Sequence, residues 1–199
     1  TLLYHDNFDK QSNMYTQAIA RKNKLTSFLR ENNYERLSKR PNVTIYTGMG
    51  SFVSPNTVKV VLSEEEIELQ GKEIFINTGS TPIIPNIEGI QQSRNVYTST
   101  TLLDLDILPK HLIIIGGGYI GLEFASMYAG FGSKVTILEI GNRFMPRNDS
   151  DIAKSIREVM EKKGIEIRLN VRTQSIHDTH DGVTLTYSDT SDGTPYFVD

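Results

Sequence analysis

Apolar residues near the start of the chain recur every three to four positions. Residues 13–38 carry them on one side, with Lys and Arg opposite, which predicts a long amphipathic packing helix. Ser12 or Asn13 is the expected N-cap, and Pro41 stops any continuation. The apolar positions of this helix are Met14, Ala18, Leu25, Phe28 and Leu29.

The pattern then changes to short β-type runs separated by turn formers. These runs predict an antiparallel meander, at residues 43–46, 52–53, 58–62, 67–69 and 74–76. Residues 78–110 are rich in Pro, Gly and Asn, so we expect a connector with a short helical turn at 101–105.

From residue 112 onward, strands and helices alternate. The expected strands are 112–115, 134–138 and 165–169, and the first is continuously apolar, as a parallel sheet buried on both faces requires. A helix at 119–131 ends at Gly132, and another begins at Asp149 or Ser150 and ends before Gly164. Residues 173–176 and 183–187 flank an Asp-Gly turn and predict a hairpin. The predicted class is α/β, with a Rossmann-like parallel sheet.

Composition excludes several functions. The chain has 199 residues, no cysteine and a formal net charge of −3, without a Lys/Arg cluster beside aromatic residues. Nucleic acid is therefore not an expected partner, and neither a disulfide nor a cysteine metal site can form. His177 and His180 lack an evident third ligand, so we predict surface residues and no metal site.

Residues 112–133 are apolar except for one charge, Glu123, and they allow two interpretations. Gly117 and Gly121 form a GxxxG pair, which also marks transmembrane helix dimers. However, a mid-span Glu costs roughly 2.5–3.5 kcal/mol on insertion scales, and glycine costs about 1 kcal/mol relative to Ala within a helix. The β-branched run before the glycines therefore favours a nucleotide-binding turn and no membrane partner.

Residues 116–121, GGGYIG, match the GxGxxG pattern between a predicted strand and helix. Gly116 allows the tight turn, Gly118 admits the pyrophosphate and Gly121 brings the helix close to the strand. Glu139 closes the second strand 23 positions on (139 − 116), where an acid binds the ribose hydroxyls. Such an acid repels the 2′-phosphate of NADP, which favours NAD(H), although nearby Arg143 could soften that choice.

Two motifs together give a family resemblance. FINTGSTPIIPNIEGI (75–90) and LIIIGGGYIGLEFASMYAGFGSKVTILE (112–139) resemble the flavin-dependent pyridine nucleotide-disulfide oxidoreductases, which include glutathione reductase, dihydrolipoamide dehydrogenase and mercuric reductase. With RKNKLTSFLREN (21–32), they are most similar to a bacterial branch near mercuric reductase that is linked to resistance to reactive chlorine.

The resemblance implies FAD and NAD(H) as cofactors. It implies that hydride passes from the nicotinamide through flavin to a Cys pair, and then to a disulfide or metal ion. It places Tyr119 over the nicotinamide pocket and gives Glu123 a catalytic role facing the flavin. The implied FAD contacts are Gly50, Thr78, Gly79 and Ser80, and the implied dinucleotide site is Gly116, Gly117, Gly118, Tyr119, Ile120, Gly121, Glu123 and Glu139.

The same resemblance implies a domain plan. Residues 1–100 would form part of an FAD domain, residues 101–109 a linker, and residues 110–199 an incomplete NAD(H) domain. The redox Cys pair and the C-terminal dimerisation domain have no counterpart here, so we expect a fragment of a cytoplasmic homodimer that is inactive alone. Two alternatives stay open: a single-cysteine NADH oxidase or coenzyme A-disulfide reductase branch, and a non-enzymatic NAD-binding module.

Overall fold

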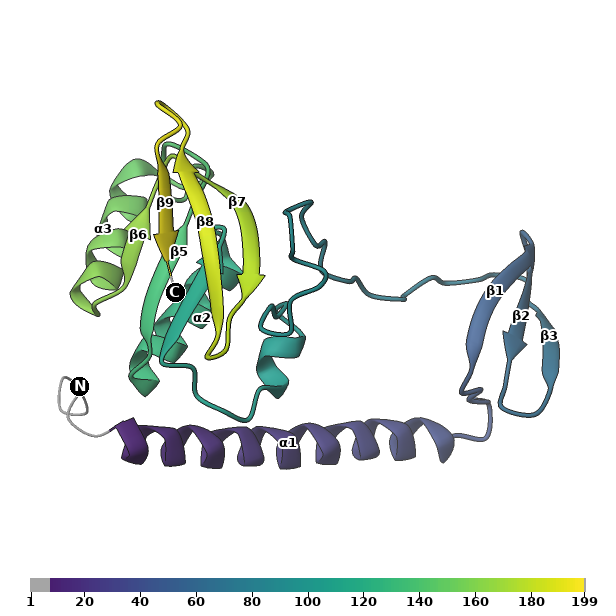
Figure 1. The fold of residues 1–199 in the computed structure, drawn as a ribbon. Helices are drawn as coiled ribbons and strands as arrows, with labels where there is room; N and C mark the ends of the chain where they lie inside the picture. The colour runs from purple at the N-terminus through teal and green to yellow at the C-terminus, as the bar shows by residue number, and fades with distance from the viewer. Residues whose placement is uncertain (1–7, 199) are drawn as a thin grey trace. The chain divides into compact units, whose positions relative to one another are not determined.

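The computed structural model describes residues 8–198, which form two compact units (Figure 1). Among the described residues, one unit contains residues 8–21 together with residues 82–198, and the other contains residues 22–81. The boundary between the units therefore falls within the first helix. The cofactor domains expected at 1–100 and 110–199 remain a prediction.

The first helix, α1 (Phe8–Ser38), begins five residues before the predicted start (13 − 8). Ser12 and Asn13 lie inside it rather than capping it: the Thr16 hydroxyl donates to the Ser12 carbonyl, and the Gln17 amide donates to the Asn13 side chain. The predicted packing stripe is largely uncovered, since Leu25, Phe28 and Leu29 are about half exposed. Tyr15, by contrast, is fully buried.

The smaller unit contains the predicted antiparallel meander, formed by β1 (Met49–Ser54), β2 (Thr57–Val61) and β3 (Glu66–Gln70). Val60 of β2 lies opposite Gly50 of β1 and Ile67 of β3.

The outer runs of that prediction were wrong, because residues 43–46 and 74–76 form no strand. A β run becomes a strand only by pairing, and neither segment pairs with another described residue. The Val43 amide instead donates to the Arg40 carbonyl, and the side chains of Phe75 and Ile76 are largely exposed.

The larger unit is built on a parallel sheet in the order β4 (His111–Ile115), β5 (Lys134–Leu138) and β6 (Glu166–Arg168). Helices α2 (Tyr119–Phe131) and α3 (Ser150–Lys162) connect these strands, which confirms the predicted βαβαβ order and α/β class. Gly132 ends α2 in the left-handed conformation, as predicted.

Two apolar clusters cover opposite sides of this sheet. Both helices pack on one side, where the fully buried Val135 and Ile137 contribute to the core. On the other side Leu138 packs with an antiparallel sheet of β7 (Val171–Asp178), β8 (Val183–Asp189) and β9 (Pro195–Val198). The β7–β8 hairpin confirms the prediction, whereas the periodicity did not predict β9.

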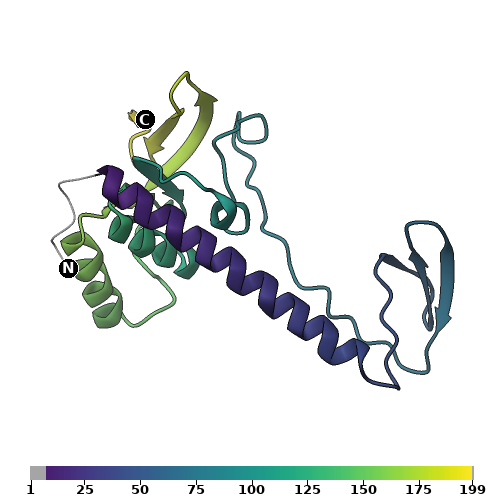
Figure 2. The same cartoon turned by 90° about the horizontal axis from the view of Figure 1, so that it is seen from below.

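The start of α1 runs beside α2 (Figure 2), and a buried pair of tyrosines joins the two helices there. The hydroxyls of Tyr15 and Tyr128 lie 2.9 Å apart. Tyr15 donates to the Leu105 carbonyl at 2.7 Å, and Tyr128 contacts the Leu102 carbonyl at 3.1 Å. Burial raises the pKa of both phenols, so both remain neutral hydrogen-bonding groups.

The connector ahead of β4 follows the predicted path. It contains the expected helical turn, η1 (Thr101–Asp104). One carboxylate at the end of β7 binds the connector through hydrogen bonds. Asp178 accepts hydrogen bonds from the Ser93 hydroxyl at 2.5 Å and the Arg94 amide at 2.9 Å. These bonds, the amide of Arg94 first, lower the pKa of Asp178 below its ordinary value of 3.8.

Candidate functional site

The candidate site lies at the carboxyl edge of the parallel sheet, where β4 and β5 end side by side. Ile115 and Leu138 are paired in register, so the residues that follow them, Gly116 and Glu139, are neighbours. The Gly116 amide donates to the Leu138 carbonyl at 2.8 Å. Open α/β sheets bind ligands outside the carboxyl ends of their strands, which makes this edge the expected place for a ligand.

The chain turns sharply between β4 and α2, and two glycines make the turn possible. Gly116 has a φ of 101°, a left-handed conformation that side chains rarely adopt. A Cβ on Gly121 would lie 2.6 Å from the Gly116 carbonyl oxygen and 3.1 Å from Cγ2 of Ile114. Glycine at these positions therefore lets the start of α2 press against the end of β4.

Gly118 differs from these two glycines, because the chain itself does not require it. Its φ of −77° suits any residue, and a Cβ built there would meet no atom within 4 Å. Gly118 caps α2, and its carbonyl accepts the Leu122 amide at 3.0 Å. The space beside Gly118 is thus open at the start of a helix, where backbone N–H groups attract phosphate.

Glu139 is held in a fixed orientation by backbone groups. Its Oε2 accepts the Gly117 amide at 2.8 Å, and its Oε1 accepts the Gly141 amide at 2.7 Å. Gly117 is buried against this carboxylate, since a Cβ there would lie 3.4 Å from Oε2. The glycine turn and Glu139, which the sequence motif linked to it, therefore lie in direct contact.

A second hydrogen bond joins the start of α2 to the loop before α3. The hydroxyl of Tyr119 donates to Oδ1 of Asn148 at 3.0 Å. The sequence analysis missed Asn148, because 29 residues separate the two and no periodic pattern connects them. The only local signal is that Asn148 directly precedes Asp149, the N-cap of α3.

The two other predicted residues on α2 point outward. Ile120 is 59% exposed, and Glu123 is exposed. The side chain of Glu123 makes no hydrogen bond or ion pair with any residue from 8 to 198. It follows Tyr119 by one helical turn, so both side chains are available on one face of α2.

The predicted FAD contacts belong to the smaller unit, whereas the glycine turn belongs to the larger one. Gly50 lies in β1, where a Cβ would meet only Cγ1 of Val58, at 3.7 Å. Thr78, Gly79 and Ser80 are exposed in an extended segment without regular structure. Gly79 has a φ of 72° and open space around it.

Comparison with known proteins decides the family. The family model described as pyridine nucleotide-disulphide oxidoreductase matches residues 5–199. The chain belongs to this family. The family assignment agrees with the motif resemblance and with the βαβ fold, although the sequence carries no cysteine.

Among the oxidoreductases most similar to this chain, the probable pyridine nucleotide-disulfide oxidoreductase RclA of Escherichia coli is 45% identical over 174 residues, covering 87% of this chain and 39% of that protein. Dihydrolipoyl dehydrogenase of Geobacillus stearothermophilus is 40% identical over 154 residues, covering 77% of this chain and 32% of that enzyme. The chain thus spans less than half of the length of these relatives.

A solved structure of RclA has a fold similar to that of this chain. The HOCl-induced flavoprotein disulfide reductase RclA from Escherichia coli has a TM-score of 0.82 and 39% sequence identity, covering 96% of this chain and 44% of that one. The likeness supports the assignment to a family of flavoproteins that use pyridine nucleotides.

Two features are absent from residues 8–198. Over that range no helix is both long enough and apolar enough to cross a bilayer. Over the same range, His, Asp and Glu do not gather in groups of three that could hold a metal ion.

Proposed function

We propose that this chain is the NAD(H)-binding part of a FAD-dependent disulfide reductase and that it prefers NADH over NADPH. The observation that supports the proposal best is the contact between the glycine turn and Glu139 at adjoining strand ends. The glycine turn offers open space at the start of α2, and Glu139 offers a carboxylate held in a fixed orientation. A dinucleotide needs both, since its pyrophosphate and its ribose are recognised separately.

The pyrophosphate would lie beside Gly118. The first N–H groups of α2 have no partner within a helix and carry the positive end of the helix dipole, so they stabilise an anion there. A side chain at residue 118 would occupy the space that the pyrophosphate needs.

Glu139 would bind the adenosine ribose. An ionised carboxylate has about four acceptor positions, and the backbone amides of Gly117 and Gly141 use one on each oxygen. Each oxygen can therefore still accept a hydrogen bond from a ribose hydroxyl. The 2′-phosphate of NADPH would bring like charges together and remove one of these donors, which is the basis for preferring NADH.

The residues further along α2 would lie toward the nicotinamide. Tyr119 and Glu123 share a face one turn apart, and the family resemblance implies that this face would lie toward the flavin. When bound, the flavin accepts hydride from the nicotinamide and supplies the redox chemistry. Glu123, which has no partner among residues 8–198, would be the catalytic carboxylate on this face. Gly50 and residues 78–80 would contact the FAD.

The reduction of a disulfide or metal ion is proposed for the whole protein. That step needs thiols, and residues 1–199 contain none. For the chain itself the proposal is therefore nucleotide binding alone. A homodimeric assembly and a cytoplasmic location are also proposed for the whole protein, from the family resemblance.

The test is a calorimetric titration of NADH into this chain and two glycine variants. Gly118→Val should still fold, because its Cβ meets no atom within 4 Å and the poorer N-cap costs only about 1 kcal/mol, but it should block the pyrophosphate. Gly182→Val is the matched control, since Gly182 also has open space around it and lies in the β7–β8 turn.

We expect NADH binding by the wild type and the control, and at least a tenfold loss for Gly118→Val, whose melting temperature should fall by only about 2–4 °C because of the poorer cap. Unchanged binding by Gly118→Val would refute the site, and absent binding by the wild type would refute the proposed role of the chain.

A further inference from the structure

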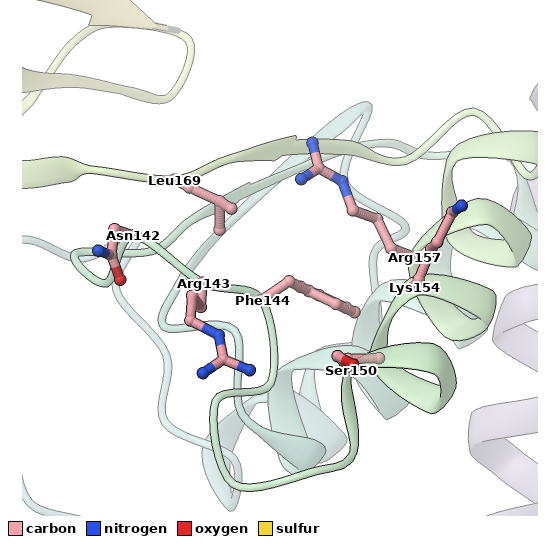
Figure 3. Close-up of a pocket in the computed structure, with 8 residues that line it drawn as sticks. Asn142, Arg143, Phe144, Ser150, Lys154, Arg157 and Leu169 are labelled. Carbon is pink, nitrogen blue, oxygen red and sulfur yellow. The ribbon is translucent and has the colours of Figure 1, made fainter.

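The segment after Glu139 is bound by the segment that follows the next strand of the parallel sheet. The carbonyl oxygen of Gly141 accepts a hydrogen bond from the Asn170 amide at 3.0 Å. Figure 3 shows the two segments at this point, marked by Asn142, which follows Gly141, and by Leu169, which precedes Asn170. Asn170 lies between β6 and β7, where the chain leaves the parallel sheet for the antiparallel one. A residue outside the dinucleotide motif therefore contacts the loop that follows Glu139.

Asn170 has an uncommon backbone conformation. Its φ is 57°, and within residues 8–198 only one other non-glycine residue, Met145, has a positive φ. Side chains rarely adopt this left-handed conformation, although asparagine tolerates it better than most residues. Both backbone groups of Asn170 are hydrogen-bonded, since its amide donates to Gly141 and its carbonyl accepts the Thr190 amide at 2.7 Å. Such a residue beside a candidate site is a reason to look for a function.

The contacts of Asn170 continue to the carboxylate of Glu139. The Gly141 amide donates to Oε1 of Glu139 at 2.7 Å, and a Cβ on Gly141 would lie only 3.1 Å from that oxygen. The main chain of Glu139 is bonded to the same β6–β7 junction, because its amide donates to the Arg168 carbonyl at 2.8 Å and its carbonyl accepts the Val171 amide at 3.1 Å. The orientation of the carboxylate therefore depends on how the chain turns at Asn170.

We propose that Asn170 is a positioning residue for ribose recognition. In its left-handed conformation it holds the Gly141 backbone, and the Gly141 amide holds Oε1 of Glu139. A carboxylate that is already held in its binding orientation loses less conformational freedom when the ligand binds, which favours affinity. The inference rests on the proposed NAD(H) site, because Asn170 acts on the nucleotide only through Glu139.

The test replaces Asn170 with valine and with glycine. Valine is β-branched and disfavours the left-handed conformation, whereas glycine adopts it freely. Gly164→Val is the matched control, because Gly164 has a φ of 80°, has open space around it and lies at the other end of β6. The melting temperature of each variant reports whether it folds, and Asn170→Ala is a milder change if the valine variant does not.

The first measurement needs no nucleotide. In ¹H–¹⁵N NMR spectra, Glu139→Gln should shift the Gly141 amide proton upfield, because that amide loses its charged acceptor. Asn170→Val should shift the same proton in the same direction, whereas Asn170→Gly and Gly164→Val should leave it at the wild-type position. An unchanged Gly141 amide in Asn170→Val would refute the positioning role, whatever the chain binds.

The second measurement is a calorimetric titration with NADH and with NADPH. Asn170→Val should bind NADH at least about fivefold more weakly than the wild type, and NADPH within about twofold, because the preference for NADH depends on Glu139. Asn170→Gly and Gly164→Val should bind NADH like the wild type. In a Glu139→Gln background, Asn170→Val should have no further effect on NADH binding.

Two results would leave Asn170 with a structural role only and overturn the proposal. One is an equal loss of affinity for NADH and NADPH in Asn170→Val, and the other is a loss of NADH affinity that persists in the Glu139→Gln background. Failure of the wild type to bind NADH would instead refute the NAD(H) site itself, and this role with it. A failure confined to the Asn170 variants leaves that site standing.

Discussion

Replacing Gly121 with alanine measures how closely helix α2 approaches the end of β4. The added Cβ would lie 2.6 Å from the Gly116 carbonyl oxygen, a backbone atom that cannot move without disturbing the glycine turn. Gly130, in the last turn of the same helix, provides a matched control, because a Cβ there meets no atom within 4 Å.

The magnitude follows from comparing the two variants. Alanine gains up to about 1 kcal/mol over glycine in a helix, and both sites lie in an end turn, so this gain roughly cancels between them. Overpacking a closely packed position costs about 1–3 kcal/mol. Gly121→Ala should therefore have a free energy of unfolding about 1–3 kcal/mol lower than Gly130→Ala.

Thermal unfolding followed by circular dichroism is the assay, since 1 kcal/mol corresponds to about 2–4 °C for a domain of 150–250 residues. Gly130→Ala should melt at or above the wild-type temperature, and Gly121→Ala several degrees below Gly130→Ala. Equal melting temperatures would refute the claim that α2 is pressed against the turn. Gly121→Ala should also weaken NADH binding, because the turn must shift, whereas Gly130→Ala should not.

Three further predictions concern the surroundings of the site. Gly132→Ala should lower the free energy of unfolding by about 1–2 kcal/mol in urea titrations, because residue 132 has a φ of 101°. Tyr128→Phe should cost about 1–3 kcal/mol in the same assay, because two buried contacts of the Tyr128 hydroxyl are lost, with the Tyr15 hydroxyl and with the Leu102 carbonyl. The lowered pKa of Asp178 means that its bond to the Arg94 amide is present at neutral pH and is lost as pH falls through a value below 3.8. An NMR pH titration of that amide should show this midpoint, and Asp178→Asn should abolish it.

Local patterns were sufficient to predict the βαβαβ part of the fold. The continuous apolar run before the glycines and the cap at Gly132 fixed β4 and α2 to within one residue. The periodicity could not predict which β runs would pair, because pairing depends on distant residues; residues 43–46 and 74–76 have β composition but no partner within 8–198. The start of α1 was misplaced because Ser12 and Asn13 are N-cap residue types that here bond within the helix.

The candidate site, like the fold, has features that the sequence predicted and others that it could not. The sequence correctly predicted that Gly116 and Glu139 each follow a strand, and the two residues are neighbours because those strands pair in register. It could not indicate that Asn148 binds Tyr119, since that contact depends on how the loop before α3 folds back. It also could not indicate that Arg143 and Lys154 line one concavity, because that depends on the packing of α3 beside the loop after Glu139 (Figure 3). The sequence alone pointed only to Arg143.

The most direct test of the central claim compares the affinities of this chain for NADH and NADPH, before and after Glu139→Gln. Each ribose hydrogen bond to an ionised carboxylate contributes about 1.5–3 kcal/mol, so the wild type should bind NADH at least about tenfold more tightly than NADPH. Glu139→Gln should weaken NADH binding and remove most of this preference, while Glu158→Gln, an exposed change on α3, should leave both affinities unchanged. Equal affinity of the wild type for the two nucleotides would contradict the account.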